Sequence, residues 1–383
     1  MRPWLLYLLV LCLPASCIEP PLHLASAEAL DPDLPVVNTE LEVQWNLSVD
    51  WNTEWHYGWT ADDESRWGPV AYPEPTGFEV RRYYLGDDPH TPVARAAVDG
   101  FHVQGTHFRR NYRYGYYHLL VWSDIDSPDG TQVLIVDDAK ADSVYATTTV
   151  TRGLLRADEE RTVTALYNQP EVFYASWVDQ VYISRDEKDY DYYDEDNRLW
   201  VKHIKANLTP RVYIYLVQAL LHHNDGRIVG VSGDAAVSAL ANSTNVRTGH
   251  TGNTPCMVYY GAGYRADVKL PSGEQVDVAG GKLTTFGLCD QPPYAAGRDT
   301  HYTGSRGDLN NYVYLTLRFR NGTEKTVTAS VTEQCQAQCY GGVLTVHFDC
   351  REIEMPPDGS GGPGNLFVPT VEDYENVDYE IPM

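Results

Sequence analysis

Alternating apolar and polar residues restrict the fold of this chain more than any other feature. From Leu41 to Trp51 every second residue is Leu, Val or Trp, and polar residues stand between them. This period of two predicts a β-strand with one buried face. Segments 264–279 and 312–331 each place two strand-like runs around a short turn, and the second turn contains Asn321-Gly322. These segments predict two β-hairpins.

Two longer segments have a similar pattern. Residues 114–136 and 211–231 each place a Tyr-rich apolar run before an Asp-Gly turn and a second apolar run, which predicts two further hairpins. Only residues 233–243 have apolar residues at a spacing typical of a helix, and we expect a short helix there. The 28 Tyr and 9 Trp favour sandwich cores, in which aromatic side chains fill the space between sheets. Because 383 residues are too many for one core, we expect an all-β protein of two β-sandwich domains in tandem, with mainly antiparallel strands.

The first residues have the composition of a secretory signal peptide. Residues 1–17 combine a basic residue, an apolar run and small residues before a cleavage site after about Cys17. No later apolar run has the roughly 18 residues of a membrane span, so we expect a secreted, extracellular protein. The expected parts are a signal peptide (1–17), an N-terminal β-sandwich domain (18–206), a cysteine-containing C-terminal β-sandwich domain (207–355) and an acidic flexible tail (356–383).

Glycosylation and disulfides fit the same compartment. Four Asn-x-Ser/Thr sequons predict a glycoprotein, at Asn46, Asn207, Asn242 and Asn321. After removal of the signal peptide five cysteines remain, all in the last third of the chain: Cys256, Cys289, Cys335, Cys339 and Cys350. The odd number predicts two disulfides of undetermined pairing and one further thiol. No second Cys pair accompanies Cys335 and Cys339 at ligand spacing, so no metal site is expected.

The net charge of −24 is concentrated in two segments. Residues 186–196 hold seven acids and one Lys, and residues 352–383 hold eight acids and no base. This distribution argues against nucleic acid as a partner and favours a basic one. Tyrosines lie among these acids, an environment that favours tyrosine sulfation. The predicted acidic binding segments comprise Asp189, Tyr190, Asp191, Tyr192, Tyr193, Asp194, Glu195, Tyr374 and Tyr379. The alternative is an unmodified, solvated loop and tail.

Two basic clusters predict contacts with glycosaminoglycans such as heparin or heparan sulfate. Residues 201–206 match the X-B-B-X-B-X pattern, and Arg109 and Arg113 would share a face if they lay on one strand. Arg81 and Arg82 could extend that patch. The expected glycosaminoglycan site comprises Arg109, Arg110, Arg113, Lys202, His203 and Lys205. The alternative for the arginines is that they form ion pairs with neighbouring carboxylates of this acidic protein.

Motifs for enzyme chemistry are absent from the sequence. There is no G-x-S-x-G, H-E-x-x-H or P-loop, so neither an enzyme nor a cofactor is expected. Two alternatives stay open: a secreted carbohydrate-active enzyme with an unrecognised carboxylate pair, and an adhesion glycoprotein that binds integrins through Arg306, Gly307 and Asp308.

The combination of features resembles one known family. A secreted two-domain β protein that is acidic, rich in Tyr and carries DYDYYDED at 189–196 is similar to the secreted chemokine-binding decoy glycoproteins of rodent gammaherpesviruses. The resemblance implies two β-sandwich domains and a role in viral immune evasion, in which host chemokines are sequestered and receptor engagement is blocked. It is one of architecture and composition, so it carries no individual residue across.

Overall fold

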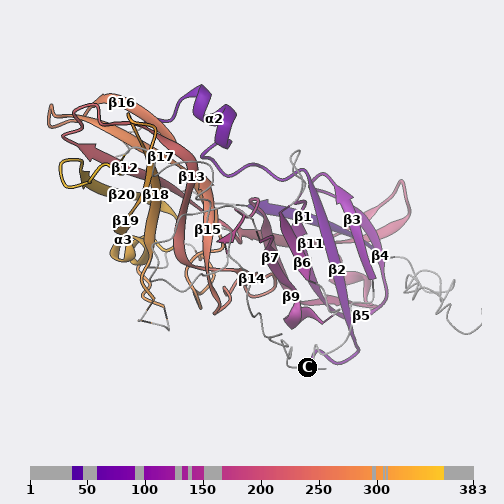
Figure 1. The fold of residues 1–383 in the computed structure, drawn as a ribbon. Helices are drawn as coiled ribbons and strands as arrows, with labels where there is room; N and C mark the ends of the chain where they lie inside the picture. Colours follow the sequence, from indigo (N-terminus) through magenta and orange to yellow (C-terminus); the bar gives the residue numbers. More distant parts are fainter. Residues whose placement is uncertain are drawn as a thin grey trace, which may run out of the picture.

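The chain is an all-β protein. The structure is a computed structural model that describes residues 37–45, 58–90, 99–125, 132–136, 140–150, 166–295, 299–304, 307 and 309–357. Figure 1 shows two lobes of strands side by side, with the first strands of the chain in one lobe and the last strands in the other. No helix in these ranges is long and apolar enough to cross a membrane.

The N-terminal lobe is one curled sheet. Its strands, in spatial order, are β3 (Asp99–Gln104), β2 (Gly77–Gly86), β5 (Gly115–Ser123), β9 (Tyr174–Ile183), β11 (Leu199–Pro210), β1 (Val37–Trp45) and β4 (Arg109–Tyr112), and β10 (Tyr192–Asp194) pairs with β11. β11 first pairs in parallel with β1 and then antiparallel with β9 at Thr209 and Pro210. The sheet therefore folds over its own core, where Leu41, Leu119 and Ile204 belong to one buried cluster.

The C-terminal lobe is a sandwich of two sheets. One sheet has the order β16 (Gly263–Lys269), β17 (Gln275–Thr285), β12 (Tyr213–His222) and β20 (Gly342–Asp349). The other has the order β19 (Glu324–Ser330), β18 (Tyr312–Phe319), β13 (Ile228–Ala241), β15 (Pro255–Gly261) and β8 (Leu166–Tyr167). Side chains of both sheets fill the core between them, among them Tyr215, Val237 and Leu315. The short helix α3 (Thr332–Ala337) precedes β20.

Segments of the first half of the chain complete the second lobe. β8 pairs with β15, and the helix α2 (Ala61–Trp67) lies against the C-terminal lobe beside β16 and β17 (Figure 1). A small sheet joins β14 (Ser243–Asn245) to β7 (Tyr145–Thr148) and β6 (Val133–Val136). A buried cluster combines Leu120 and Phe173 with Val246 and Phe286. The expected boundary at residue 206 falls inside β11, so the chain leaves the first sheet only after Pro210.

Both short hairpins that the sequence predicts are confirmed. β16 pairs antiparallel with β17, and β18 with β19. Gly322 in the β18–β19 turn has φ +79°, a backbone conformation that glycine adopts without strain. The expected strand that begins near Leu41 is also present as β1, with Leu41 and Val43 buried; residues 46–51 lie outside the described ranges.

The predictions of two long hairpins at 114–136 and 211–231 and of a helix at 233–243 are wrong. β5 pairs with β2 and β9, whereas β6 pairs with β7. β12 and β13 belong to opposite sheets of the C-terminal sandwich, so the turn between them crosses from one layer to the other. Residues 233–243 fall largely in β13, which has a register shift between Val237 and Leu240 and a positive φ at Ala239. That bulge breaks the period of two, and the spacing of its apolar residues imitates a helical period.

Candidate binding surface

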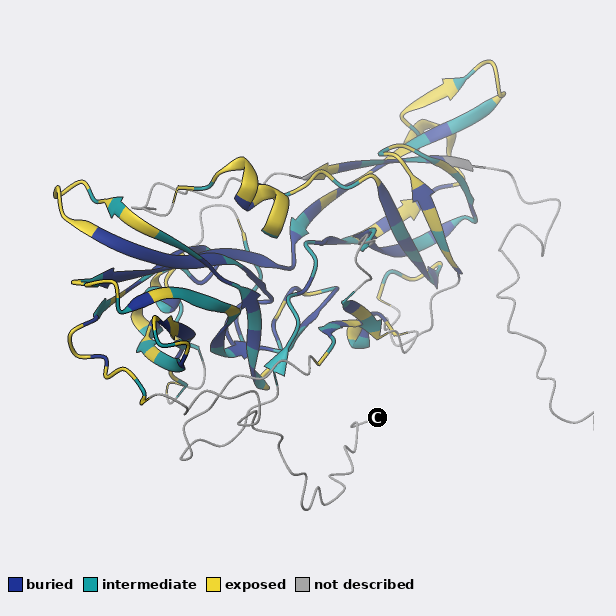
Figure 2. Ribbon diagram, turned by 45° about the horizontal axis from the view of Figure 1, so that its top comes forward, coloured by how far each residue is buried: buried dark blue, intermediate teal, exposed yellow. Residues whose placement is uncertain are grey.

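The acidic run forms an ordered hairpin. After a short 3₁₀ turn at Glu187–Asp189, β10 pairs antiparallel with the start of β11, with Tyr192 opposite Val201 and Tyr193 opposite Trp200. In Figure 1 this hairpin is the pink loop that projects past β4, and Figure 2 shows much of its surface as exposed. The segment is therefore a defined surface element with a fixed backbone.

Arg109 of β4 holds the hairpin against the sheet. Its Nη1 donates to Asp194 Oδ2 at 2.5 Å, and its Nη2 donates to the hydroxyl of Tyr192 at 3.1 Å. Asn197 donates to Asp194 from its backbone and its side chain, at 3.1 and 3.0 Å. Hydrogen bonds from Asn197, joined by the one from Arg109, lower the pKa of Asp194 to about 2. Asp194 is thus ionised at neutral pH and is an internal acceptor of the hairpin.

Further contacts tie the hairpin to β11. The ammonium group of Lys202 donates to the carbonyl of Asp189 at 3.0 Å, and the backbone N–H of His203 donates to Asp191 Oδ2 at 2.7 Å. The hydroxyl of Tyr190 donates to the carbonyl of Ser184. These contacts account for the closeness of acidic and basic residues in the sequence, since the bases anchor the acidic strand.

Four carboxylates of the hairpin take no part in these contacts. Their side chains are exposed and make no salt bridge or hydrogen bond to any residue that the structure describes; they are Glu187, Asp189, Glu195 and Asp196. Asp186, by contrast, pairs with Lys188. The hairpin thus presents a set of unengaged negative charges on an ordered frame.

A stripe of alternating charge runs beside the hairpin. Strand β1, which lies between β11 and β4, carries Glu40 and Glu42. The register places them opposite His203 and Lys205 of β11, and Glu40 also lies opposite Arg109 of β4. His203 Nε2 is 2.9 Å from Glu40 Oε2, and Lys205 Nζ is 3.0 Å from Glu42 Oε2. Hydrogen bonds from Gln44 and then Lys205 lower the pKa of Glu42. His203 and Lys205 are thus partners of carboxylates within the protein. Arg109, paired with Asp194, matches the alternative interpretation of the arginines.

The remaining arginines of the expected glycosaminoglycan site are dispersed. Arg110 stacks on Phe101, with its guanidinium carbon 4.7 Å from the ring centroid. Arg113 follows the end of β4 at Tyr112, so no strand places it on a face with Arg109. Arg82 does not extend the patch, because it is buried in an ion pair with Asp99. Sequence spacing alone did not reveal where β4 ends or that Arg82 points inward.

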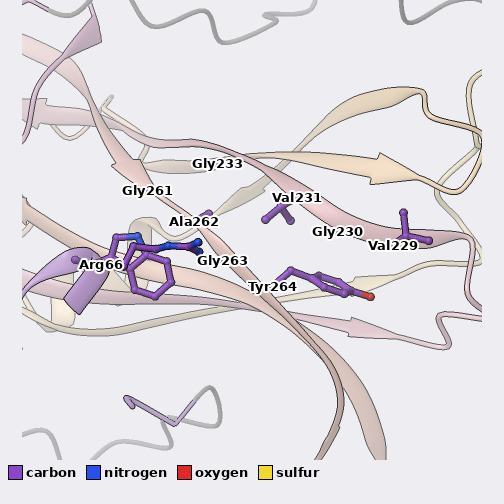
Figure 3. A pocket seen from close by; sticks show the side chains of 10 residues that line it. Arg66, Val229, Gly230, Val231, Gly233, Gly261, Ala262, Gly263 and Tyr264 are labelled. Carbon is purple, nitrogen blue, oxygen red and sulfur yellow. The ribbon is translucent and has the colours of Figure 1, made fainter. Parts of the chain in front are cut away.

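A pocket of about 430 Å³ lies under α2 in the C-terminal lobe (Figure 3). Arg66 and Trp67 of α2 form one wall, and glycine-rich stretches of β13 and of the β15–β16 connection form the floor. Arg265 pairs with Asp63 and holds α2 in place. A Cβ atom at Gly261 would lie 2.8 Å from Trp67 Nε1, so only glycine admits the indole there. The sequence contained no signal for this pocket, because its walls come from residues about 160–200 positions apart.

The ends of β12 and β20 in the same lobe bring histidines together. His222 Nδ1 lies 2.8 Å from Glu274 Oε1, and His222 Nε2 lies 2.9 Å from His347 Nδ1. His223 is paired with Asp349 at 3.2 Å. No group of three or more metal-ligating side chains with suitable geometry occurs within the described ranges.

Other expected sites are placed only in part. Asn207 is exposed, whereas Asn242 and Asn321 are half-buried, and Asn321 donates to the carbonyl of Pro356 at 2.9 Å. All five cysteines are buried, and burial raises the pKa of Cys335 to about 12. The structure shows no disulfide among Cys256, Cys335 and Cys350, and the pairing of the five cysteines stays a prediction. The residues that lie outside the described ranges are Asn46, Arg306, Asp308, Tyr374, Tyr379 and the whole expected signal peptide.

No protein-family profile and no curated protein sequence matches this chain. Solved structures similar to it include a candidate adhesin from Bacteroides ovatus, at 15% identity over 85% of this chain and 96% of that one, with a TM-score of 0.45. The fimbrial anchor protein Mfa2 from Porphyromonas gingivalis is 14% identical over 81% and 90%, with a TM-score of 0.39. A candidate polysaccharide-binding protein from Bacteroides thetaiotaomicron is 8% identical over 82% and 91%, with a TM-score of 0.39. Because these TM-scores lie below 0.5, the likeness assigns neither a family nor a function to this chain.

Proposed function

We propose that this is a secreted binding protein that captures small basic proteins of the chemokine class through its acidic hairpin. The observation that carries the proposal is that some carboxylates of the hairpin are bonded within the protein while others are exposed without such bonds. Asp191 and Asp194 are bonded to the body of the protein, while Glu187, Asp189, Glu195 and Asp196 remain exposed and unengaged. A partner meets a preformed acidic edge, so little conformational entropy is lost when the hairpin binds.

Electrostatics explain how such a surface would act. Residues 186–196 contain seven acids and one Lys, so a basic protein is attracted before contact. Complementary charge mainly accelerates association, and close contacts of Tyr193 and Trp200 with the partner would then slow dissociation. The resemblance to secreted chemokine-binding decoys supports this partner class, and it implies that capture prevents chemokines from engaging their receptors.

A binding panel tests this proposal. Purified protein is immobilised and exposed to chemokines of several classes, with a small basic protein unrelated to chemokines as the control for charge alone. We expect dissociation constants well below micromolar for at least one chemokine class and much weaker binding of the control. Failure of every chemokine to bind below micromolar concentration would refute the proposal, and equal binding of the control would reduce it to unspecific charge attraction.

Glycosaminoglycan binding is a second proposal, supported by the exposed bases on both sides of β1. The side chain of Lys205 is 59% exposed and that of Arg109 is 40% exposed, so sulfate groups can reach both. Sulfates would compete with Glu42 for Lys205, and with Asp194 and the nearby charge of Glu40 for Arg109. Heparin chromatography of a Glu40→Gln/Glu42→Gln variant should therefore show elution at higher salt than the wild type, and Lys205→Ala should show elution at lower salt. The same elution salt for all three proteins would exclude this stripe as the site.

A further inference from the structure

The three tyrosines of the hairpin differ in what their hydroxyl groups do. The hydroxyl of Tyr190 is bonded to the carbonyl of Ser184, and its side chain is half-buried. The hydroxyl of Tyr192 accepts the hydrogen bond from Arg109. That of Tyr193 makes no hydrogen bond to any described residue, and Tyr193 is 44% exposed. Of these three residues, Tyr193 alone offers an unengaged phenol.

Strand geometry explains the difference. Successive side chains of a strand point to opposite faces, so Tyr192 and Asp194 both meet Arg109 while Tyr193 points the other way. The ring of Tyr193 packs edge-on against Trp200 across the strand pair, with centroids 5.2 Å apart and an interplanar angle of 61°. Trp200 thus fixes the ring and leaves the phenol at the surface.

The surroundings of Tyr193 are those of a modifiable tyrosine. Asp191, Asp194, Glu195 and Asp196 lie within three positions of it. β10 is extended, and among the described strands it pairs with β11 alone, so its other backbone edge is open. An extended segment with one open edge is the form in which a peptide can add to an edge of another protein's sheet. We infer that Tyr193 is a sulfation site.

The modification is a group transfer from a nucleotide phosphosulfate, catalysed by a sulfotransferase of the secretory pathway. The phenolic oxygen of Tyr193 forms a bond to sulfur, the bond from sulfur to the phosphate oxygen breaks, and the phenol proton passes to a base of the transferase. The nucleotide leaves with the phosphate. Sulfation of Tyr192 would require loss of its bond to Arg109, and sulfation of Tyr190 would require exposure of a hydroxyl that is bonded inward.

Sulfation would extend the acidic edge of the hairpin. The sulfate carries a permanent negative charge and lies on the strand that leads to Glu195 and Asp196, two of the unengaged carboxylates. Three acceptor oxygens on a rigid ring suit arginine-rich partners. The modification itself does not depend on the identity of the partner, so its test is separate from the chemokine panel.

Peptide mapping tests this inference on protein secreted from mammalian cells. Trypsin cleaves after Lys188 and Arg198, which releases a peptide whose only tyrosines are Tyr190, Tyr192 and Tyr193. We expect one sulfate on this peptide, located at Tyr193 by fragmentation that preserves sulfate esters. A sulfatase should remove it and a phosphatase should not. Tyr190→Phe and Tyr192→Phe should keep the sulfate, and Tyr193→Phe should lose it while keeping the ring that packs on Trp200.

Three results would overturn the inference. They are a wild-type peptide without the added mass, a sulfate located at Tyr190 or Tyr192, and an added group that only a phosphatase removes. Each of these results leaves the chemokine panel unaffected, and a negative chemokine panel leaves the sulfate mapping unaffected.

Discussion

Individual carboxylates of the hairpin differ in their contacts, although they form one continuous acidic run in the sequence. Composition predicted an exposed acidic segment with tyrosines, and the structure places one there. Composition could not separate Asp194, bonded to Arg109 and Asn197, from Asp196, which makes no such contact in the described part of the chain. The difference depends on Arg109, about 85 residues away in sequence, so no local pattern reveals it.

The contacts of Asp194 predict a pH-dependent hairpin. Its folded pKa of about 2 lies below the ordinary value of 3.8, so its contribution is fully present above 3.8 and is lost as the pH falls through about 2. We expect the backbone signals of Tyr192 and Tyr193 in NMR spectra to keep their folded positions down to about pH 4 and to move toward random-coil positions below it. Asp194→Ala should produce that movement at neutral pH.

The matched control is Asp196→Asn, which changes one charge of the same hairpin without removing a contact. Its Tyr192 and Tyr193 signals should stay in their folded positions at neutral pH. Equal signals for Asp194→Ala and the wild type would show that the contacts of Asp194 with Arg109 and Asn197 do not hold the hairpin.

At the scale of elements, locality decided which parts of the fold were predictable. The β16–β17 and β18–β19 hairpins were predictable because each forms within one short segment around a tight turn. β12 and β13 are also consecutive, yet they lie in opposite sheets with the core between them. Hydrophobic alternation does not distinguish this arrangement from a hairpin, because a strand has the same pattern whether its neighbour in sequence pairs with it or packs against it from the other sheet. The position of α2 on the other lobe depends on Trp67 and on the Asp63–Arg265 ion pair, neither of which has a sequence signal.

Docking of α2 can be tested at two glycines of the same pocket. Gly261→Ala places a methyl group within 2.8 Å of the Trp67 indole, whereas a Cβ atom at Gly230 meets nothing within 4 Å. We expect Gly261→Ala to displace Trp67 and to lower the free energy of unfolding by about 1–3 kcal/mol, the usual range for overpacking. Amide exchange of residues 61–67 should become faster in this variant.

Gly230→Ala serves as the control, since it adds the same methyl group to the pocket floor without touching the helix. Its amide exchange in α2 should equal that of the wild type. If the amide exchange rates of residues 61–67 are the same in both variants, contact of Trp67 with Gly261 does not hold α2 in place.

At the scale of the whole molecule, hydrophobic alternation predicted the all-β class, and the structure shows that residues from both halves of the chain pack in one buried cluster. Leu120 and Phe173 from the first half of the chain are buried with Val246 and Phe286 from the second. No single boundary in the sequence therefore separates two independent cores. The acidic hairpin projects from a body whose two lobes are joined by this buried cluster. The hairpin segment 186–196 holds seven acids and one Lys in a chain of net charge −24, and this concentration supports the role proposed for it.

Association kinetics at several salt concentrations test the central claim most directly. The test variant is Asp189→Asn/Glu195→Gln/Asp196→Asn, which neutralises three unengaged carboxylates of the hairpin. The control is Glu333→Gln/Glu352→Gln/Glu354→Gln, which removes the same charge from exposed positions of the C-terminal lobe. Because steering by charge speeds encounter and is screened by salt, we predict that the hairpin variant binds a chemokine about 3–10 times more slowly at low salt, with a shallower salt dependence. The control should match the wild type. Equal association rates and salt slopes for the two variants would contradict the account, because chemokine capture would then not involve the acidic hairpin.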